Sequence, residues 1–274
     1  IYDPHPPFIP PRVYADEFDA KSMPGAHHRA SDKVTQEALK EADFQTPYQA
    51  PAERDGKEEQ ALYYAMIAQI DDQFARLMQG LEDSGQSENT LIIFTSDHGE
   101  MLGDHGLMYK GCRFYEGLVR VPLIFNFPGV IPANVQPEGL VELLDMSATI
   151  LDYAGIDIPD YFQGRSLRPV LEGKAKGDVF RESVRCEYFD ALHAHFTGGK
   201  GTFATMYRRG NFKLCIYHGL NVGELYDLEN DPWEHENLWD SPEHQVVKNQ
   251  LIYQSFDQHV LLTTDVGSPR IAPY

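Results

Sequence analysis

A buried strand that ends in an Asp-His-Gly sequence constrains this chain more than any other feature. The apolar residues 91–94 lead into Thr95-Ser96-Asp97-His98-Gly99-Glu100. Ligands of open α/β sheets bind beyond the carboxyl ends of the strands. Because Asp97 and His98 offer a carboxylate and an imidazole to one ion, the sequence predicts a metal site here. An ordinary strand-to-loop turn, capped by Asp97 and bent at Gly99, remains the alternative.

Composition predicts a substantial core under a strongly acidic surface. Of the 274 residues, 42% are hydrophobic, and 42 acidic against 23 basic residues give a net charge of −19. Such a surface repels nucleic acid and anionic membranes, and no stretch approaches the ~20 apolar residues of a membrane span. We therefore expect no nucleic-acid partner and no membrane span. An anionic substrate would need positive charge from a metal ion or from a few Lys and Arg side chains.

Helices and strands alternate over the first two thirds of the chain, which predicts an α/β fold. Apolar residues recur at steps of three and four over 57–83, as in an amphipathic helix, and Gly85 is a suitable stop. Further elements are a helix at 143–154 and strands at 90–96 and 121–127. This alternation favours a mostly parallel sheet with covering helices. Residues 12–56 lack periodicity and are expected to form a long surface loop.

The pattern changes near residues 173–177, beyond which short extended segments follow one another. A closing helix is expected at 241–262, and the strands at 183–189, 203–208, 212–217 and 224–228. They predict a small C-terminal α+β subdomain with an antiparallel sheet. We place the boundary so that residues 1–177 form the larger domain and residues 178–274 the subdomain.

Three more side chains are candidates for binding an oxyanion. Lys110 and His105 lie in a loop rich in glycine, and Lys110 would supply positive charge to an oxyanion. His5 lies among prolines, whose fixed φ angles would hold its ring for a role as general acid or oxyanion contact. A solvated Lys110 and plain loop roles for both histidines remain open. Glu100 and Asp104 are either supports of the metal site or solvated loop acids.

Taken in order, the motifs of the chain resemble the sulfatase family of the alkaline phosphatase superfamily. The segments that carry the resemblance are Pro4-His5-Pro6-Pro7-Phe8, Thr95-Ser96-Asp97-His98-Gly99-Glu100, Gly103-Asp104-His105-Gly106, Lys110, Tyr115-Glu116, Arg120-Val121-Pro122-Leu123-Ile124, Pro128-Gly129, Gly164-Arg165-Ser166-Leu167 and Glu224-Leu225-Tyr226-Asp227-Leu228-Glu229-Asn230-Asp231-Pro232. The resemblance implies an alkaline-phosphatase-like fold. Residues 1–177 would then be the C-terminal part of the catalytic domain.

The resemblance also implies an activity, the hydrolysis of a sulfate ester with a metal ion and a formylglycine nucleophile. Asp97 and His98 would be metal ligands, and Lys110 would contact the sulfate group. His5 would face the leaving-group oxygen, with His105 as a further substrate-binding candidate. The substrate would be a sulfated small molecule or carbohydrate. The resemblance favours Ca²⁺, while the imidazole leaves Mn²⁺ or Mg²⁺ open.

The chain departs from the resemblance because it lacks a recognisable nucleophile. Cys112, Cys186 and Cys215 do not lie in the Cys/Ser-x-Pro/Ala-x-Arg context that yields formylglycine, and the paired N-terminal metal aspartates are not identifiable. We therefore expect the N-terminal half of the domain to be a missing partner, and the 274-residue chain alone to be inactive. The alternatives are a phosphonate monoester or phosphodiester hydrolase of the same superfamily and a non-catalytic sulfatase-like subunit. The sequence does not indicate the compartment.

Overall fold

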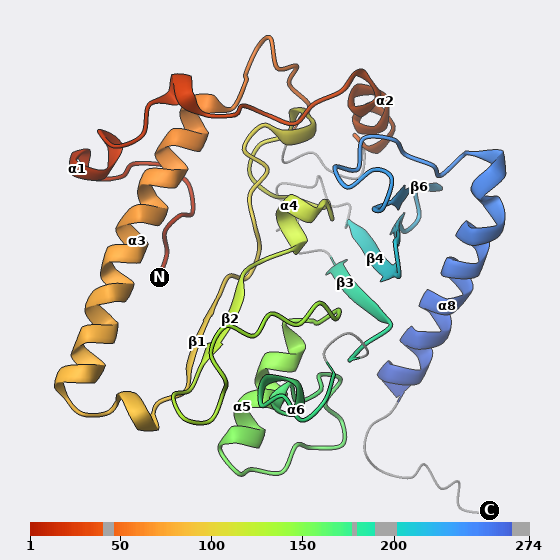
Figure 1. Cartoon of the computed structure of the whole chain (residues 1–274). Coiled ribbons are helices and arrows are strands. Elements are labelled where there is room, and N and C mark those ends of the chain that lie inside the picture. Colours follow the sequence, from red (N-terminus) through yellow and green to blue (C-terminus); the bar gives the residue numbers. More distant parts are fainter. Residues whose placement is uncertain (41–46, 177–179, 190–201, 265–274) are drawn as a thin grey trace, which may run out of the picture.

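The computed structural model describes residues 1–40, 47–176, 180–189 and 202–264 (Figure 1). The boundary expected after residue 177 lies outside these residues. The α-helices are α1 (Arg12–Ala15), α2 (Ala30–Leu39), α3 (Lys57–Asp83), α4 (Glu116–Val119), α5 (Leu144–Tyr153), α6 (Arg168–Leu171) and α8 (Gln245–Thr264). The strands are β1 (Ile92–Thr95), β2 (Leu123–Asn126), β3 (Ser183–Phe189), β4 (Phe203–Arg209), β5 (Phe212–Tyr217) and β6 (Val222–Asp227). Short 3-10 turns occur at Ala20–Ser22, Ser87–Asn89, Asp104–Gly106 and Pro242–His244.

Helix α3 has the bounds that its apolar periodicity predicts. Acidic side chains in its first turn, Glu58 and Glu59, suit the positive end of the helix dipole. At the other end Gly85 has a φ of 68°, its N–H donates to Glu82 O, and Gln86 N donates to Leu81 O. This is a Schellman motif, in which glycine satisfies the left-handed position. The predicted stop is therefore confirmed.

Strands β1 and β2 pair in an antiparallel direction, whereas the sequence predicts a mostly parallel sheet. β1 and β2 are antiparallel, with Ile92 opposite Asn126 and Thr95 opposite Leu123. A parallel pair needs a crossover connection, usually a helix that packs on the sheet. Residues 96–122 between these strands are long enough for a crossover but contain only the 3-10 turn and the four-residue α4. The chain doubles back instead of crossing over. The parallel direction expected between these two strands is therefore wrong, although both strands lie where the sequence places them.

Strands β3 to β6 form an antiparallel sheet in chain order, which confirms the four C-terminal strands (Figure 1). Gly210, with a φ of 56°, and Asn211 make the predicted turn between β4 and β5. Helix α8 covers this sheet, with Leu251 packed against Tyr207 and Leu214. Apolar burial at about 25 cal/mol per Å² is the main force that holds such a helix to its sheet.

Helix α2 lies inside the segment that the sequence predicts to be loop, so that expectation is wrong over residues 30–39. Its buried residues are Asp32, Thr35, Gln36 and Leu39, which follow helical spacing but are mostly polar. An apolar periodicity could not reveal a helix whose inner face carries polar groups. This helix matters because it brings Asp32 into the interior.

An apolar surface formed by α3, β1 and β2 is exposed. The stripe on α3 is only partly covered, and Leu77 is 62% exposed. Beside α3, the strand pair β1–β2 completes an apolar groove lined by Ile67, Ile70, Phe74, Met78, Ile92, Phe94 and Ile124. Within the described residues, no helix is both long enough and apolar enough to cross a membrane.

Candidate active site

Asp97 and His98 follow β1 directly and present two neighbouring ligand atoms. His98 Nδ1 lies 2.8 Å from the Gly99 carbonyl oxygen, so this nitrogen carries the proton and donates it. In the neutral form of the ring, Nε2 then keeps its lone pair. This nitrogen lies 3.8 Å from Asp97 Oδ2. The side chains of Asp97 and His98 are 85% and 40% exposed. A carboxylate oxygen and an unprotonated imidazole nitrogen at this spacing fit two positions around one divalent metal ion.

The Asp97 carboxylate is held in its charged form. Partial burial acts to raise its pKa, but the neighbouring His98 and the His98 N–H outweigh burial and lower the pKa of Asp97. The His98 N–H donates to Asp97 Oδ1 at 3.0 Å, which leaves Oδ2 as the outward-facing oxygen. Asp97 thus does two things: its Oδ1 caps the turn, as in an ordinary strand-to-loop turn, and its Oδ2 stays accessible to a metal ion.

Gly99 sets the path of the chain after the Asp-His pair. A Cβ atom on Gly99 would lie 1.9 Å from the Gly117 carbonyl oxygen, so only glycine fits without a backbone shift. Gly99 N donates to Leu118 O at 2.8 Å, and Glu100 N donates to Gly117 O at 3.2 Å. These bonds attach the segment after His98 to α4. The glycine of the motif is required by close backbone packing.

Lys110 meets His5 across 105 residues of sequence. His5 Nδ1 lies 2.7 Å from the Pro6 carbonyl oxygen, which can only accept, so Nδ1 is the protonated nitrogen. His5 Nε2 then accepts a hydrogen bond from Lys110 Nζ at 2.5 Å. Both side chains are partly exposed. Two of the sequence-predicted site residues are thus brought into direct contact, although their catalytic roles stay predictions.

Aromatic packing explains how the proline-rich segment reaches Lys110. The ring of Phe8 lies 5.8 Å from that of Tyr63 on α3 and 6.3 Å from that of Tyr109, measured between centroids. The loop after β1 folds back on itself, and Met101 N donates to Tyr109 O at 3.0 Å. This bond holds Lys110 in the loop that begins at the Asp-His pair, where its charge acts on Glu100.

Glu100 and Asp104 support this loop rather than lying in open solvent. Glu100 Oε1 accepts from the backbone N–H of Met101 at 3.1 Å, and Asp104 Oδ1 accepts from His27 N at 2.8 Å. Burial raises the pKa of both carboxyls, against opposing hydrogen bonds from backbone N–H groups. Their contacts order the turn between the Asp-His pair and Lys110.

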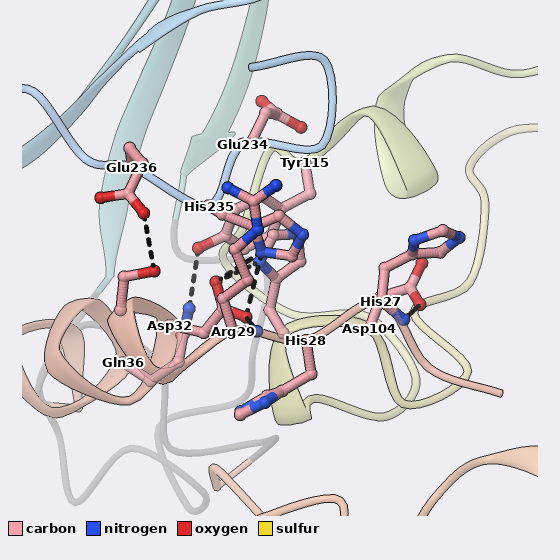
Figure 2. A network of polar contacts seen from close by, with 12 residues as sticks. His27, His28, Arg29, Asp32, Gln36, Asp104, Tyr115, Glu234, His235 and Glu236 are labelled. Carbon is pink, nitrogen blue, oxygen red and sulfur yellow. Dashed lines mark hydrogen bonds and ion pairs between the residues drawn. The ribbon is translucent and has the colours of Figure 1, made fainter.

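His105 lies in a buried cluster with Asp32 and His235, the last two of which are labelled in Figure 2. Its side chain is 5% exposed, its Nδ1 lies 3.1 Å from Asp32 Oδ1, and its ring stacks on Tyr115 at 3.9 Å. His235 Nδ1 approaches the same Asp32 oxygen at 3.0 Å. Among the described residues, His105 makes no contact with His5 or Lys110. The structure therefore gives a substrate-binding role for His105 no support, and the role stays a prediction.

Sequence reasoning missed Asp32 and His235, the two partners of His105. Asp32 follows Arg29 by three residues and accepts its backbone N–H at 2.6 Å, a capping pattern at the start of α2. That pattern would have indicated a helix start but not a site. His235 follows the Glu224–Pro232 motif, at a distance of about 200 residues from Asp32 in the chain. Only the fold shows that these side chains converge.

Solved structures of similar proteins establish the fold class of this chain. Among solved structures, a phosphonate monoester hydrolase from Silicibacter pomeroyi matches 96% of this chain and 55% of its own, at 26% identity and a TM-score of 0.81. A structure in complex with its substrate, D-glucosamine-2-N,6-O-disulfate, matches 77% of this chain and 42% of its own, at 30% identity and a TM-score of 0.67. The α/β fold class is therefore that of the alkaline phosphatase superfamily.

Family models then identify the family. The Sulfatase model matches residues 2–156, and the model of the C-terminal part of N-sulphoglucosamine sulphohydrolase matches residues 103–259. The chain belongs to the sulfatase family, as its motifs predict.

Curated relatives are longer than this chain. It is 34% identical to an N-acetylglucosamine-6-O-sulfatase of Bacteroides thetaiotaomicron over 69% of this chain and 34% of that protein. It is 30% identical to an arylsulfatase of Clostridium perfringens over 88% of this chain and 48% of that protein. The chain thus spans about a third to a half of the length of these relatives.

Proposed function

We propose that this chain carries the metal-binding and oxyanion-binding part of a sulfuric ester hydrolase. The observation that carries the proposal is the contact of Lys110 Nζ with His5 Nε2 at 2.5 Å. It joins the proline-rich segment 4–8 to the loop after β1, and in that loop the charge of Lys110 also acts on Glu100, two residues after His98. Membership of the sulfatase family supports the same reaction.

Lys110 would bind the sulfate group. One of its three N–H groups points to His5, so two remain for oxyanion oxygens. In a site shielded from water, such a cation stabilises charge that develops on the transferring group. His5, fixed through Pro6 O, would face the leaving-group oxygen. Once its Nε2 is protonated, it would act as the acid or the stabilising donor there.

Asp97 Oδ2 and His98 Nε2 would hold the metal ion, which supplies polarisation of the ester and a site for the nucleophile. Ca²⁺ fits the family, and Mn²⁺ or Mg²⁺ are the alternatives that an imidazole ligand allows. The formylglycine nucleophile and the other metal ligands would come from a segment outside residues 1–274. That the chain spans 34% and 48% of two relatives supports this division.

Two further parts of the proposal concern organisation and substrate. Residues 1–177 would belong to the catalytic domain and residues 178–274 to a C-terminal subdomain, which the separate four-stranded sheet supports. The substrate would be a sulfated small molecule or carbohydrate. The similarity to an N-acetylglucosamine-6-O-sulfatase and to a structure holding a sulfated glucosamine supports a sulfated sugar.

A phosphonate monoester hydrolase is the second candidate. The structure similar at a TM-score of 0.81 has that activity in its name, and it covers more of this chain than the sulfated-glucosamine complex does. A lysine and a histidine that bind an oxyanion suit a phosphonate as well as a sulfate.

Hydrolysis rates on matched substrates test the proposal. The gene product that carries this chain is assayed on 4-nitrophenyl sulfate, on a 4-nitrophenyl phenylphosphonate and on a 4-nitrophenyl phosphodiester. We expect the highest kcat/KM on the sulfate. A preference for the phosphonate would favour the second candidate, and no hydrolysis of any of the three would favour a non-catalytic subunit.

A further inference from the structure

Three buried side chains from distant parts of the chain converge on one point, and Figure 2 shows two of them, Asp32 and His235. Asp32 comes from α2, His105 from the turn after β1, and His235 from the segment after β6. One ligand atom from each lies within 4.8 Å of the other two. The exposed fractions of their side chains are 1%, 5% and 4%. The convergence is therefore a property of the interior.

The spacing of these atoms is that of ligands on one ion. Asp32 Oδ1 lies 3.1 Å from His105 Nδ1 and 3.0 Å from His235 Nδ1. Neighbouring ligands of a tetrahedral zinc ion with bonds of ~2.0 Å are roughly 3.3 Å apart. Small shifts of side chains would thus admit an ion. Without an ion, each Nδ1–H donates to the shared carboxylate oxygen; binding an ion would require each ring to carry its proton on Nε2 instead.

Surrounding contacts hold each ligand in place. The Arg29 N–H donates to Asp32 Oδ2 at 2.6 Å, which orients the carboxylate. Oδ1 faces both histidines, and His235 Nδ1 also lies 3.1 Å from Oδ2. Stacking on Tyr115 at 3.9 Å fixes the ring of His105. Next to His235, the Glu234 carboxylate pairs with Lys213 at 2.6 Å, which anchors that segment. Preorganised supports of this kind are what metal ligands require.

We propose that Asp32, His105 and His235 form a second metal site, for a divalent first-row transition metal, with Zn²⁺ as the ion of choice. Two imidazoles and one carboxylate match the donors that Zn²⁺ accepts, and they suit Ca²⁺ and Mg²⁺ poorly because those ions prefer oxygen. The ion would join α2, the loop of the candidate active site and the C-terminal sheet segment. Its role is structural, and the site does not depend on the proposed hydrolase function.

Zinc binding is measured on a background that lacks the other candidate metal ligands. The background variant Asp97→Asn/His98→Ala is dialysed against Zn²⁺, and bound metal is counted by mass spectrometry. We expect one Zn²⁺ per chain, and a rise in Tm with added Zn²⁺ because the ion binds only the folded state. Adding His235→Asn should remove the bound ion and the rise in Tm. Adding His244→Asn, a histidine outside the cluster, should remove neither.

Spectroscopy shows whether a variant loses metal binding because a ligand is removed or because the chain unfolds. Co²⁺ in place of Zn²⁺ should give visible d–d bands in the background variant, and the bands should disappear with His105→Asn while the far-UV circular dichroism is retained. The proposal is overturned if the folded background variant binds no Zn²⁺ or Co²⁺. It is also overturned if His105→Asn and His235→Asn leave the binding unchanged, since the ion would then lie elsewhere.

Discussion

At the scale of single residues, Lys213 stabilises the contact between the C-terminal sheet and the loop region of the site. Its fully buried Nζ lies 2.7 Å from Glu116 Oε1 and 2.6 Å from Glu234 Oε1, and it donates to Phe114 O at 2.8 Å. Lys213→Met would leave two carboxylates facing each other. Removing one partner of a buried pair costs about 3–5 kcal/mol, so we expect a loss of that size in urea unfolding.

An exposed lysine provides the control for this substitution. Lys40 pairs with Glu37 at 3.5 Å on the surface of α2, with both side chains more than half exposed. Exposed pairs contribute about 0–1 kcal/mol, so Lys40→Met should change the free energy of unfolding little. Equal losses for the two variants would contradict the role assigned to the burial of Lys213.

Glu116 gives this cluster a dependence on pH. Burial acts to raise its pKa, but the charge of Lys213 and its hydrogen bond outweigh burial, so the pKa of Glu116 in the folded state is lowered. A lowered pKa contributes stability above the unfolded value of about 4.3, and this contribution is lost as the pH falls through the folded value. The difference in unfolding free energy between wild type and Glu116→Gln should thus be largest near neutral pH. It should shrink below about pH 4; a difference that grows there would contradict the assignment.

The site residues differ in how far the sequence alone could predict them. Asp97, His98, Lys110 and His5 could be predicted because each lies in a local motif whose chemistry is visible in its neighbours. The meeting of His5 with Lys110 rests on the resemblance and on packing through Phe8, which no local pattern contains. A convergence such as that of Asp32 and His235 depends wholly on the tertiary fold.

At the scale of elements, Gly99 joins the strand end to α4. A Cβ atom there would lie 1.9 Å from the Gly117 carbonyl oxygen, and the backbone would have to move to remove this overlap. We expect Gly99→Ala to lower the free energy of unfolding by roughly 1–3 kcal/mol, as overpacking does. It should also displace His98 and weaken metal binding at the Asp-His pair, which metal titration measures.

Gly80→Ala is the matched control for Gly99→Ala. Gly80 lies inside α3, and a Cβ atom there would meet nothing within 4 Å. Alanine is favoured over glycine inside a helix by about 1 kcal/mol, so this substitution should raise the free energy of unfolding. The same change of residue should therefore have opposite signs at the two positions. A loss of stability at both would contradict the packing argument.

Element boundaries followed from the sequence where apolar patterns decide them. α3 and the four C-terminal strands lie where periodicity and turn residues predict. α2 was missed because its buried face is polar, with Asp32 and Gln36 turned inward. The direction of β2 against β1 was also missed, because strand patterns carry no information on pairing sense and the connection, residues 96–122, is long enough for either direction.

At the scale of the whole molecule, the open groove between α3 and the β1–β2 pair accords with the proposal that a further segment completes the domain. Its lining includes Phe74 and Phe94, whose rings lie 5.5 Å apart. We expect the isolated 274-residue chain to release no sulfate from 4-nitrophenyl sulfate, because its proposed nucleophile lies outside it. Turnover by the isolated chain, retained after removal of contaminating activity, would contradict this.

Lys110 and His5 are proposed to act together on one oxyanion. The measurement is a double-mutant cycle on kcat/KM for 4-nitrophenyl sulfate, in the gene product that carries this chain, with Lys110→Ala, His5→Ala and both. Groups that act as a unit are non-additive. We predict that each single variant loses at least ~100-fold in kcat/KM with folding intact, and that the double variant loses little more. Single losses below about twofold, or losses that simply multiply, would show that Lys110 and His5 do not act as one unit.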